Sequence, residues 1–322
     1  MGARKALFVI DPPETFSPTA DSTYVMVTEA LRRGHEPYGA LLSDLSLHAS
    51  AAFVNARPLG FTGGDPTLRF VGEGQRQPMS NFDVVVMRKD PPVDQGFMTS
   101  TWILDRAGTL VVNEPAGLRS LNEKLSIAAF ADLTPRTYVS RDASELREIL
   151  ATLGGRMIVK PVYGFGGREI LLAREDDPNL GSLLEIATAD GTRWTVAQEF
   201  VPQASDGDKR ILLVDGEPIG AVLRVPAKGE LRNNFHAGGA PVRVELDDAD
   251  RKICAAVGPM LRAAGQFFVG LDVIGGKLTE INVTSPTGMQ EINRLEQRAE
   301  GSTTQAMFWD ALESKLGDDT RS

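Results

Sequence analysis

Cysteine is nearly absent from this chain of 322 residues, which contains only Cys254. No intrachain disulfide can form, and this composition fits a reducing compartment. Cys254 lies in helical step with Val257 and Leu261, a spacing that places it on the apolar face of a helix. We therefore predict that this thiol packs in a core and has no catalytic role.

Histidine is scarce, and long apolar runs are missing. The three histidines, His35, His48 and His236, lie far apart and lack the spacing of metal ligands. No apolar run approaches the ~20 residues that span a bilayer, and the stretch at residues 5–10 is too short for a signal peptide. The formal net charge of -9 argues against nucleic acid or an anionic membrane as a main partner. We expect a cytoplasmic protein.

The first third of the chain alternates apolar and helical patterns. Residues 5–10, 83–87 and 110–113 have the composition of buried strands, and residues 22–33 form a helical pattern that ends at Gly34. Strands separated by a helix in this way predict a parallel sheet, with functional residues at the carboxyl ends of its strands.

The remainder of the chain predicts further domains. Its length exceeds the size at which one hydrophobic core stops growing, so we expect two or three domains. Helical patterns near residues 143–153, 179–188 and 247–264 alternate with short strands. The fold class predicted for the whole chain is therefore α/β, with α+β character after the first domain.

Residues 157–172 place a lysine and several glycines between two apolar strands. Lys160 ends the first strand, and Gly164, Gly166 and Gly167 follow in the turn. Glycines let backbone N–H groups approach phosphate oxygens, and a lysine adds a positive charge. Because a strand follows the turn, the pattern differs from a Walker loop, and a plain surface hairpin is an equally good interpretation.

Two weaker signals follow. A strand ends in the polar residues Gln198 and Glu199 before Val201, and such an end can present backbone groups to an adenine edge, although most have no ligand. Arg224 follows an apolar run, which favours an anionic partner for its charge. The loop at 226–241 is rich in glycine, asparagine and basic residues, and it is either a lid that excludes water or a surface loop.

The strongest signal is the segment 268–286, which has two short apolar strands joined by a glycine turn. Asp272, Glu280 and Asn282 supply oxygen ligands only, and such ligands suit Mg²⁺, which usually brings substrate phosphates with it. A two-residue loop would pair Asp272 with Thr279 and turn it away from Glu280. We predict a three-residue loop at 275–277, which pairs Asp272 with Glu280.

The order of these features resembles the ATP-grasp superfamily. An early lysine, Lys124, is followed by a second lysine before a glycine loop, a polar strand end and an Asp…Glu-x-Asn set. Two strings, MRKDPP at residues 87–92 and TEINVTSPT at residues 279–287, narrow the resemblance to bacterial glutathione synthetases. The resemblance runs from about residue 6 to 315.

This resemblance implies an ATP-grasp fold preceded by an N-terminal α/β domain with a parallel sheet. It divides the chain into an N-terminal domain (1–121), a central subdomain (122–200) and a C-terminal subdomain (201–316) that carries the lid and the metal site. It also implies a homo-oligomer, specifically a tetramer.

The implied activity is the ATP-dependent ligation of γ-glutamylcysteine to glycine through an acyl phosphate. ATP would be bound by Lys124, Lys160, Gly164, Gly166, Gly167, Gln198, Glu199, Val201 and Asp208. Mg²⁺, for which Mn²⁺ could substitute, would be held by Asp272, Glu280 and Asn282. The reacting groups would be steadied by Arg210, Arg224 and Arg232. The peptide and glycine would be placed by Arg88, Ser285, Pro286 and Thr287.

Two alternatives share the same fold. One is a ligase that joins a different acidic peptide or amino acid to an amine. The other is a non-catalytic ATP-binding module, against which the intact set of lysines, arginines and oxygen ligands argues. None of these hypotheses includes nucleic acid or a membrane as a partner.

Overall fold

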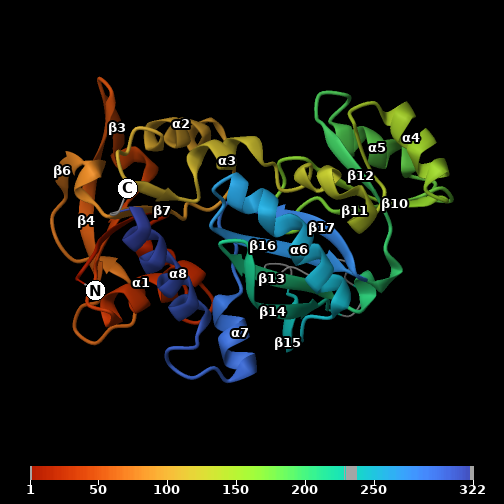
Figure 1. Cartoon of the computed structure of the whole chain (residues 1–322). Coiled ribbons are helices and arrows are strands. Elements are labelled where there is room, and N and C mark those ends of the chain that lie inside the picture. Colours follow the sequence, from red (N-terminus) through yellow and green to blue (C-terminus); the bar gives the residue numbers. More distant parts are fainter. Residues whose placement is uncertain (1, 228, 230–237, 320–322) are drawn as a thin grey trace.

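The computed structural model describes residues 2–227, 229 and 238–319, which form three sheets with helices packed on them (Figure 1). The strands of the first sheet are β1 (Lys5–Val9), β2 (Glu36–Ala40), β3 (Leu45–His48), β4 (Ala51–Gly60), β5 (Arg69–Phe70), β6 (Gln75–Pro78), β7 (Val84–Met87) and β8 (Leu110–Val112). Their order is β3-β4-β2-β1-β7-β8, with β5 and β6 paired to β4.

This first sheet is mixed. Strands β2, β1, β7 and β8 run parallel, as the alternation of strands and helices predicts. The parallel part is extended at one edge, where β4 runs antiparallel to β2 and pairs with β3, β5 and β6. The chain between β2 and β7 folds back in hairpins instead of crossing over through a helix, and hairpins impose antiparallel pairing.

Helix α1 (Ser22–Arg32) packs beside the last helix of the chain, α8 (Thr304–Asp319). The side chain of Asp21 caps α1 by accepting hydrogen bonds from the backbone N–H groups of Thr23 and Tyr24, at 2.7 and 3.2 Å. The indole Nε1 of Trp309 donates to the carbonyl oxygen of Met26 at 2.9 Å. The end of the chain therefore completes the core of the first domain.

Shorter helical elements connect the strands of the first domain. They are α2 (Gln95–Leu104), α3 (Pro115–Ser120) and the 3-10 turns η1 (Pro13–Thr15), η2 (Leu42–Asp44) and η3 (Met79–Asn81). A further 3-10 segment, η4 (Ser126–Leu133), leads into the second sheet.

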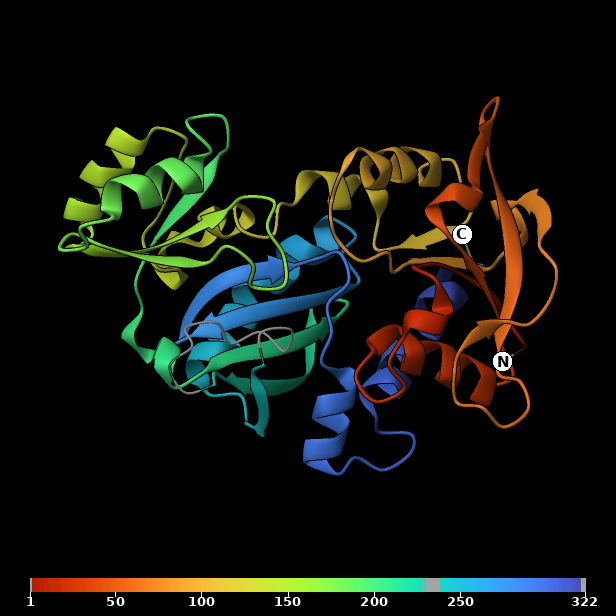
Figure 2. The same cartoon turned by 180° about the vertical axis from the view of Figure 1, so that it is seen from behind.

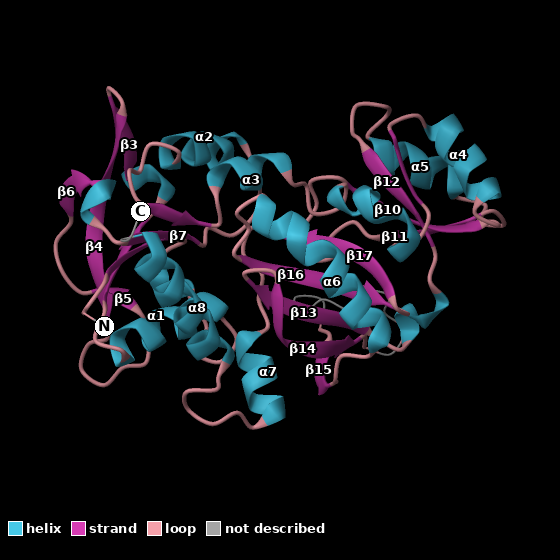
Figure 3. Cartoon of the chain, viewed as in Figure 1, coloured by secondary structure: helices cyan, strands magenta, loops and turns pink. Residues whose placement is uncertain are grey.

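The second sheet is antiparallel and comprises β9 (Thr137–Ser140), β10 (Arg156–Pro161), β11 (Leu171–Arg174) and β12 (Thr195–Glu199), in the order β11-β10-β12-β9. Helices α4 (Ala143–Thr152) and α5 (Leu180–Thr188) pack against it (Figure 3). Leu146, Leu150 and Leu184 of these helices are buried in one cluster with Met157 and Val159 of β10. The predicted helical patterns are confirmed here.

The third sheet comprises β13 (Asp208–Val214), β14 (Glu217–Val225), β15 (Ala240–Arg243), β16 (Phe268–Ile274) and β17 (Lys277–Asn282). Its order is β15-β14-β13-β16-β17, and all its pairings are antiparallel. The 3-10 turn η5 (Pro202–Ser205) precedes it, and α6 (Asp248–Ala263) and α7 (Met289–Glu296) complete the unit.

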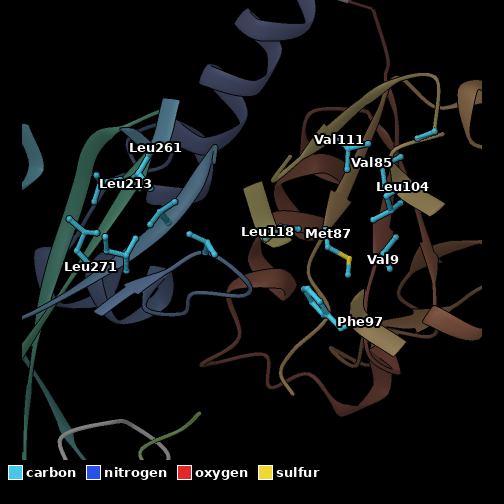
Figure 4. Packing of buried hydrophobic residues seen from close by; sticks show 14 of the residues in the cluster. Val9, Val85, Met87, Phe97, Leu104, Val111, Leu118, Leu213, Leu261 and Leu271 are labelled. Carbon is cyan, nitrogen blue, oxygen red and sulfur yellow. The ribbon is translucent and has the colours of Figure 1, made fainter. Parts of the chain in front are cut away.

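One face of the third sheet forms a core with α6. Leu213 and Leu271 from the sheet and Leu261 from the helix belong to one buried cluster, and Figure 4 shows their side chains close together. Cys254 lies in the same cluster, and burial raises the pKa of its thiol to about 11. The prediction that Cys254 packs in a core is confirmed. The opposite face carries the polar side chains Asp208, Arg210, Arg224 and Asp272 at one end, and apolar residues such as Leu212 and Val222 that pack in a second cluster at the other.

Asn113 joins the first sheet to the third. Its Nδ2 donates to the carbonyl oxygens of Phe268 and Val283 at 2.8 and 2.6 Å, and its Oδ1 accepts from the N–H of Phe268 at 2.8 Å. Because this buried amide of the first unit satisfies backbone groups of β16 and of Val283, just after β17, it fixes how the two units meet. Among the described residues, no helix has the length and apolar composition that crossing a membrane requires.

The contact between α3 and the end of α6 is too close for any side chain at Gly117. A Cβ added there would lie 2.3 Å from the carbonyl oxygen of Ala264. We expect Gly117→Ala to lower the free energy of unfolding by about 1–3 kcal/mol, because the two elements must move apart. Urea unfolding followed by circular dichroism measures this.

Gly181 provides the matched control, since it also lies in a helix and a Cβ there would meet nothing nearer than Arg147 Nη2 at 3.7 Å. Gly181→Ala should stabilise by roughly 0.5–1 kcal/mol through helix propensity. Equal effects of the two substitutions would contradict the close interface.

Candidate active site

A cavity of about 820 Å³ is lined by residues from all three sheets and their loops. This volume is at the upper end of the range for ligand sites, about 300–1,000 Å³. Figure 2 shows the face on which the second sheet lies over the third, with the loop that follows β10 between them. Cavity residues thus come from parts of the sequence that only the fold brings together.

The hairpin of β16 and β17 has a different turn from the predicted one. Ile274 pairs with Lys277 across a two-residue loop, Gly275–Gly276, so the predicted three-residue loop is wrong. Both glycines have positive φ angles, 54° and 73°, as a tight hairpin turn requires.

The predicted pairing of Asp272 with Glu280 is nevertheless present. Val273 pairs with Leu278 and Asp272 with Glu280, so Thr279 is an extra residue in β17, a β-bulge. The hydroxyl of Thr279 donates to the carbonyl oxygen of Asp272 at 3.1 Å. The bulge puts Asp272 and Glu280 on the cavity face and keeps Leu278 and Ile281 in the core.

Asp272 is the centre of a buried ionic cluster. Its Oδ1 accepts from Nε of Arg210 at 2.6 Å and its Oδ2 from Nη2 of Arg210 at 3.0 Å. Nη2 of Arg224 lies 3.0 Å from the same Oδ2. Burial alone would raise the pKa of Asp272, but the two guanidinium groups hold it well below its usual range. Asp272 is therefore ionised, as a metal ligand must be.

Asp208 pairs with Arg224 at the edge of this cluster. Burial raises the pKa of Asp208 to about 6, with the negative charge of Asp272 contributing, although Arg224 opposes the shift. Its Oδ1 is buried and accepts no hydrogen bond within the described residues. A donor from a bound molecule would satisfy this oxygen.

The two lysines predicted to bind phosphate both face Glu280. Nζ of Lys160 lies 3.0 Å from Oε1 of Glu280, and Nζ of Lys124 lies 3.9 Å from it. Nζ of Lys124 also donates to the carbonyl oxygen of Gly164 at 2.5 Å, which ties the glycine loop to the cavity. The cations lower the pKa of Glu280 against the effect of burial.

The glycines of the loop, Gly164, Gly166 and Gly167, lie in the cavity wall. Gly166 and Gly167 have φ angles of 63° and 73°, a backbone conformation that few other residues adopt at low cost. The loop presents its backbone to the cavity opposite Lys160 and Glu280.

The polar end of β12 is divided between the cavity and the surface. Gln198 is buried in the cavity wall and donates from Nε2 to the hydroxyl of Thr137 at 2.9 Å. The side chain of Glu199 forms an ion pair with Arg136 at 2.9 Å instead. Neither Glu199 nor Val201 lines the cavity, so only their backbone groups are candidates for contacts there. The apolar wall near Gln198 comes from Ile158, Ile170, Ala204 and Ile274, which the sequence did not single out.

The turn formed by Ser285, Pro286 and Thr287 also lines the cavity. Arg88, predicted to place the substrate, lies outside the cavity lining and is 4% exposed. Its Nη2 donates to the carbonyl oxygen of Pro286 at 3.1 Å, so it supports the turn from behind. Arg232 and most of the predicted lid at 226–241 lie outside the described residues.

Five carboxylates in the cavity wall were not predicted from the sequence: Asp11, Asp21, Asp90, Glu123 and Glu291. Glu123 accepts a hydrogen bond from the hydroxyl of Thr284 at 2.8 Å, and burial raises its pKa. The only sequence feature that could have pointed to Glu123 is its position next to Lys124. Glu291 of α7 also lines the cavity, and nothing in its local sequence distinguishes it.

Asp272, Glu280 and Asn282 fit a hard cation. All three line the cavity and offer oxygen atoms from adjacent strands. Nδ2 of Asn282 is buried without a hydrogen-bond partner within the described residues, so its amide is not committed elsewhere through that atom. Within the described residues, no three acidic, histidine or cysteine side chains are grouped to hold a metal, so a cation here would rely on two carboxylates and one amide.

Comparisons with known proteins agree over nearly the whole chain. Residues 5–119 match the family model for the N-terminal domain of prokaryotic glutathione synthetase, and residues 123–297 match the model for its ATP-grasp domain. The glutathione synthetase of Shewanella oneidensis is 44% identical over 313 residues, which cover 96% of this chain and 98% of that protein.

Solved structures support the fold. The D-cycloserine synthetase DcsG superposes with a TM-score of 0.66 at 16% identity, covering 97% of this chain and 99% of that one. The ATP-grasp ligase PsnB, solved with a phosphomimetic variant of its minimal precursor, Mg and ADP, gives a TM-score of 0.59 at 19% identity, covering 97% of this chain and 99% of that one.

The Asp272 cluster gives a prediction about stability. Asp272→Asn should lower the free energy of unfolding by about 3–5 kcal/mol, because it leaves Arg210 buried beside a neutral amide. Chemical unfolding in a buffer with a chelator measures this without any contribution from metal.

Glu199→Gln is the control, because it makes the same change of carboxylate to amide in an ion pair that is 38% exposed on the glutamate side. Its effect should be much smaller, since water screens the pair. A loss for Asp272→Asn no larger than that of the control would contradict the central role of Asp272.

Proposed function

The chain belongs to the prokaryotic glutathione synthetase family, and we propose that it joins γ-glutamylcysteine to glycine with ATP in the 820 Å³ cavity. The observation that carries the proposal is the set of groups that line one cavity: two lysines, two buried arginines and the oxygens of Asp272, Glu280 and Asn282. Phosphoryl transfer needs positioned positive charge more than a nucleophile, and this cavity supplies it.

Glu280 and Asn282, with Asp272 beside them, would hold Mg²⁺ or Mn²⁺. When bound, the ion would neutralise phosphate oxygens during transfer. The lysines Lys124 and Lys160 now face Glu280, and they would turn their charge toward the phosphates of ATP once the ion neutralises that carboxylate.

In the first step, the cysteinyl carboxylate of the dipeptide attacks the γ-phosphorus of ATP. A bond forms between a carboxylate oxygen and phosphorus, and the bond from phosphorus to the bridging oxygen breaks to release ADP. Arg210 and Arg224 would stabilise the charge that develops between the two substrates, because both are fixed by Asp272 before any substrate binds.

In the second step, the neutral amine of glycine attacks the carbonyl carbon of the acyl phosphate, and inorganic phosphate leaves. An acyl phosphate hydrolyses in water, so the loop 226–241 would exclude water, and its Arg232 would add a third positive charge. Ser285 and Thr287 would orient the peptide, held by Arg88 from behind.

For the nucleotide, Gln198 and the backbone at Glu199 and Val201 would bind the adenine. The free Oδ1 of Asp208 would accept a hydrogen bond from a ribose hydroxyl. Gly164, Gly166 and Gly167 would cover the phosphates.

The activity itself is testable by phosphate release. With ATP, Mg²⁺ and γ-glutamylcysteine, the protein should release phosphate rapidly only when glycine is added, together with glutathione detected by mass spectrometry. Release without glycine dependence, or only with a different acceptor amine, would favour the related ligase. No release with any amine would favour the ATP-binding module.

Glu280 gives a second test. Glu280→Gln should raise the KM for ATP and the Mg²⁺ concentration needed for half-maximal rate by roughly tenfold or more, because one ligand charge is lost. Isothermal titration of ADP with and without Mg²⁺ gives a readout independent of turnover.

Glu185→Gln, an exposed position on α5 outside the cavity, should leave both values unchanged. Full affinity of the Glu280→Gln variant for the Mg²⁺ complex of ADP would remove Glu280 from the metal site.

A further inference from the structure

One wall of the cavity is rich in carboxylates, with Lys89 among them, and comes from segments other than those that carry Lys124 and Lys160. It is formed by loops of the first sheet and by the start of α7, and its acidic residues are Asp11, Asp21, Asp90 and Glu291. An acidic wall repels the phosphates of ATP, so its ligand must be a different chemical group.

Two of these carboxylates, Asp11 and Asp21, have partners within the protein. Asp21 caps α1 through the N–H groups of Thr23 and Tyr24. Asp11 pairs with Lys89 at 3.0 Å and accepts from the N–H of Asp90 at 3.0 Å. These bonds explain why Asp11 and Asp21 lie where they do without any ligand.

Glu291 is different. It is 6% exposed and lines the cavity, yet its Oε2 is buried and has no hydrogen-bond partner within the described residues. Burial raises the pKa of its carboxyl group, Arg294 opposes the shift, and the charge of Asp21 adds to it. A buried carboxylate oxygen without a donor is costly, so a cationic donor from a bound molecule accounts for its position.

The position of Glu291 relative to the reacting groups limits which cation this is. Gly288, which precedes α7, lies against Arg210, since a Cβ there would be 3.5 Å from Arg210 Cγ. Glu291 follows about 4.5 Å further along the helix axis. The start of α7, and with it this part of the acidic wall, is thus near Arg210.

We propose that Glu291, with Asp21 beside it, binds the α-ammonium group of the γ-glutamyl residue of the dipeptide. This rests on the proposed function. The dipeptide carries one permanent ammonium group, at the end opposite the carboxylate that reacts beside Arg210 and Arg224. The amine of glycine must be neutral to attack, so it gains nothing from a carboxylate partner. A metal ion is a poorer fit, because Oδ1 of Asp21 is already used by two backbone N–H groups and a hard cation takes six or more oxygen ligands.

The test compares γ-glutamylcysteine with glutarylcysteine, which has the same length and the same carboxylates and differs only in having a hydrogen in place of the α-amino group. A second analogue is γ-glutamylcysteine N-acetylated at the α-amino group, which keeps the nitrogen but removes its positive charge. The wild-type protein should prefer γ-glutamylcysteine to both by roughly 10- to 100-fold in kcat/KM, the range of a charge-assisted hydrogen bond.

Glu291→Gln should raise the KM for γ-glutamylcysteine by a similar factor and remove most of the preference, with unchanged KM for ATP and glycine. Glu296→Gln is the matched control, since Glu296 lies on the same helix, pairs with Arg298 at 2.7 Å and is outside the cavity lining. It should retain the wild-type preference. Thermal unfolding of Glu291→Gln without substrate should occur at or above the wild-type temperature, because an unpartnered buried charge is removed.

Several outcomes would overturn the proposal. They are a wild-type protein that uses all three dipeptides equally, a Glu291→Gln variant that loses the same factor with each, or a variant whose KM rises for glycine instead. If Glu291→Gln does not fold, the same KM measurements on Glu291→Asp and the comparison of the three dipeptides with the wild-type protein still test the proposal. Failure of the wild-type protein to use γ-glutamylcysteine and glycine at all would instead refute the proposed function.

Discussion

The ion pair between Asp272 and Arg210 is the interaction on which the site depends. A carboxylate and a guanidinium are each costly to bury, and together they make the cavity face of the third sheet possible. Arg224 adds a second cation to the same carboxylate. Because these side chains come from β13, β14 and β16, the register of three neighbouring strands is tied to one charge cluster. Asp208 and Glu280, on either side, take their places from that register.

The sequence was a good guide to the strands and to the chemistry of the hairpin, and a poor guide to its turn. The alternation of side chains along β17 is interrupted at Thr279 by a β-bulge. The prediction instead obtained the pairing of Asp272 with Glu280 from a turn that was one residue longer. A signal was present: Leu278 and Ile281 are both apolar and three residues apart, which a regular strand cannot place on one face. Only a bulge between Leu278 and Ile281 places both side chains in the core while Asp272 and Glu280 face the cavity.

Contacts between distant segments were beyond reach from the sequence. Asn113 and Phe268 are 155 residues apart, and nothing local to either shows that they meet. The same applies to Glu199 and Arg88, whose residue types suggested ligand contacts while their neighbours in space turn one to the surface and the other behind the turn. Residue type limits the chemistry of a side chain, and the fold decides what it reaches. The order of motifs along the chain was enough to indicate the family, because each motif is a weak signal alone and the order combines them.

The packing of α8 on α1 has a consequence for how the protein is made. The indole of Trp309 bonds to the carbonyl of Met26, 283 residues away, and Phe308, Trp309 and Leu312 are fully buried there. During synthesis at about 5–20 residues per second, α1 emerges from the ribosome many seconds before α8 exists. Throughout that interval the apolar side of α1 has no helix to cover it. The core of the N-terminal domain can therefore be completed only after α8 has been synthesised.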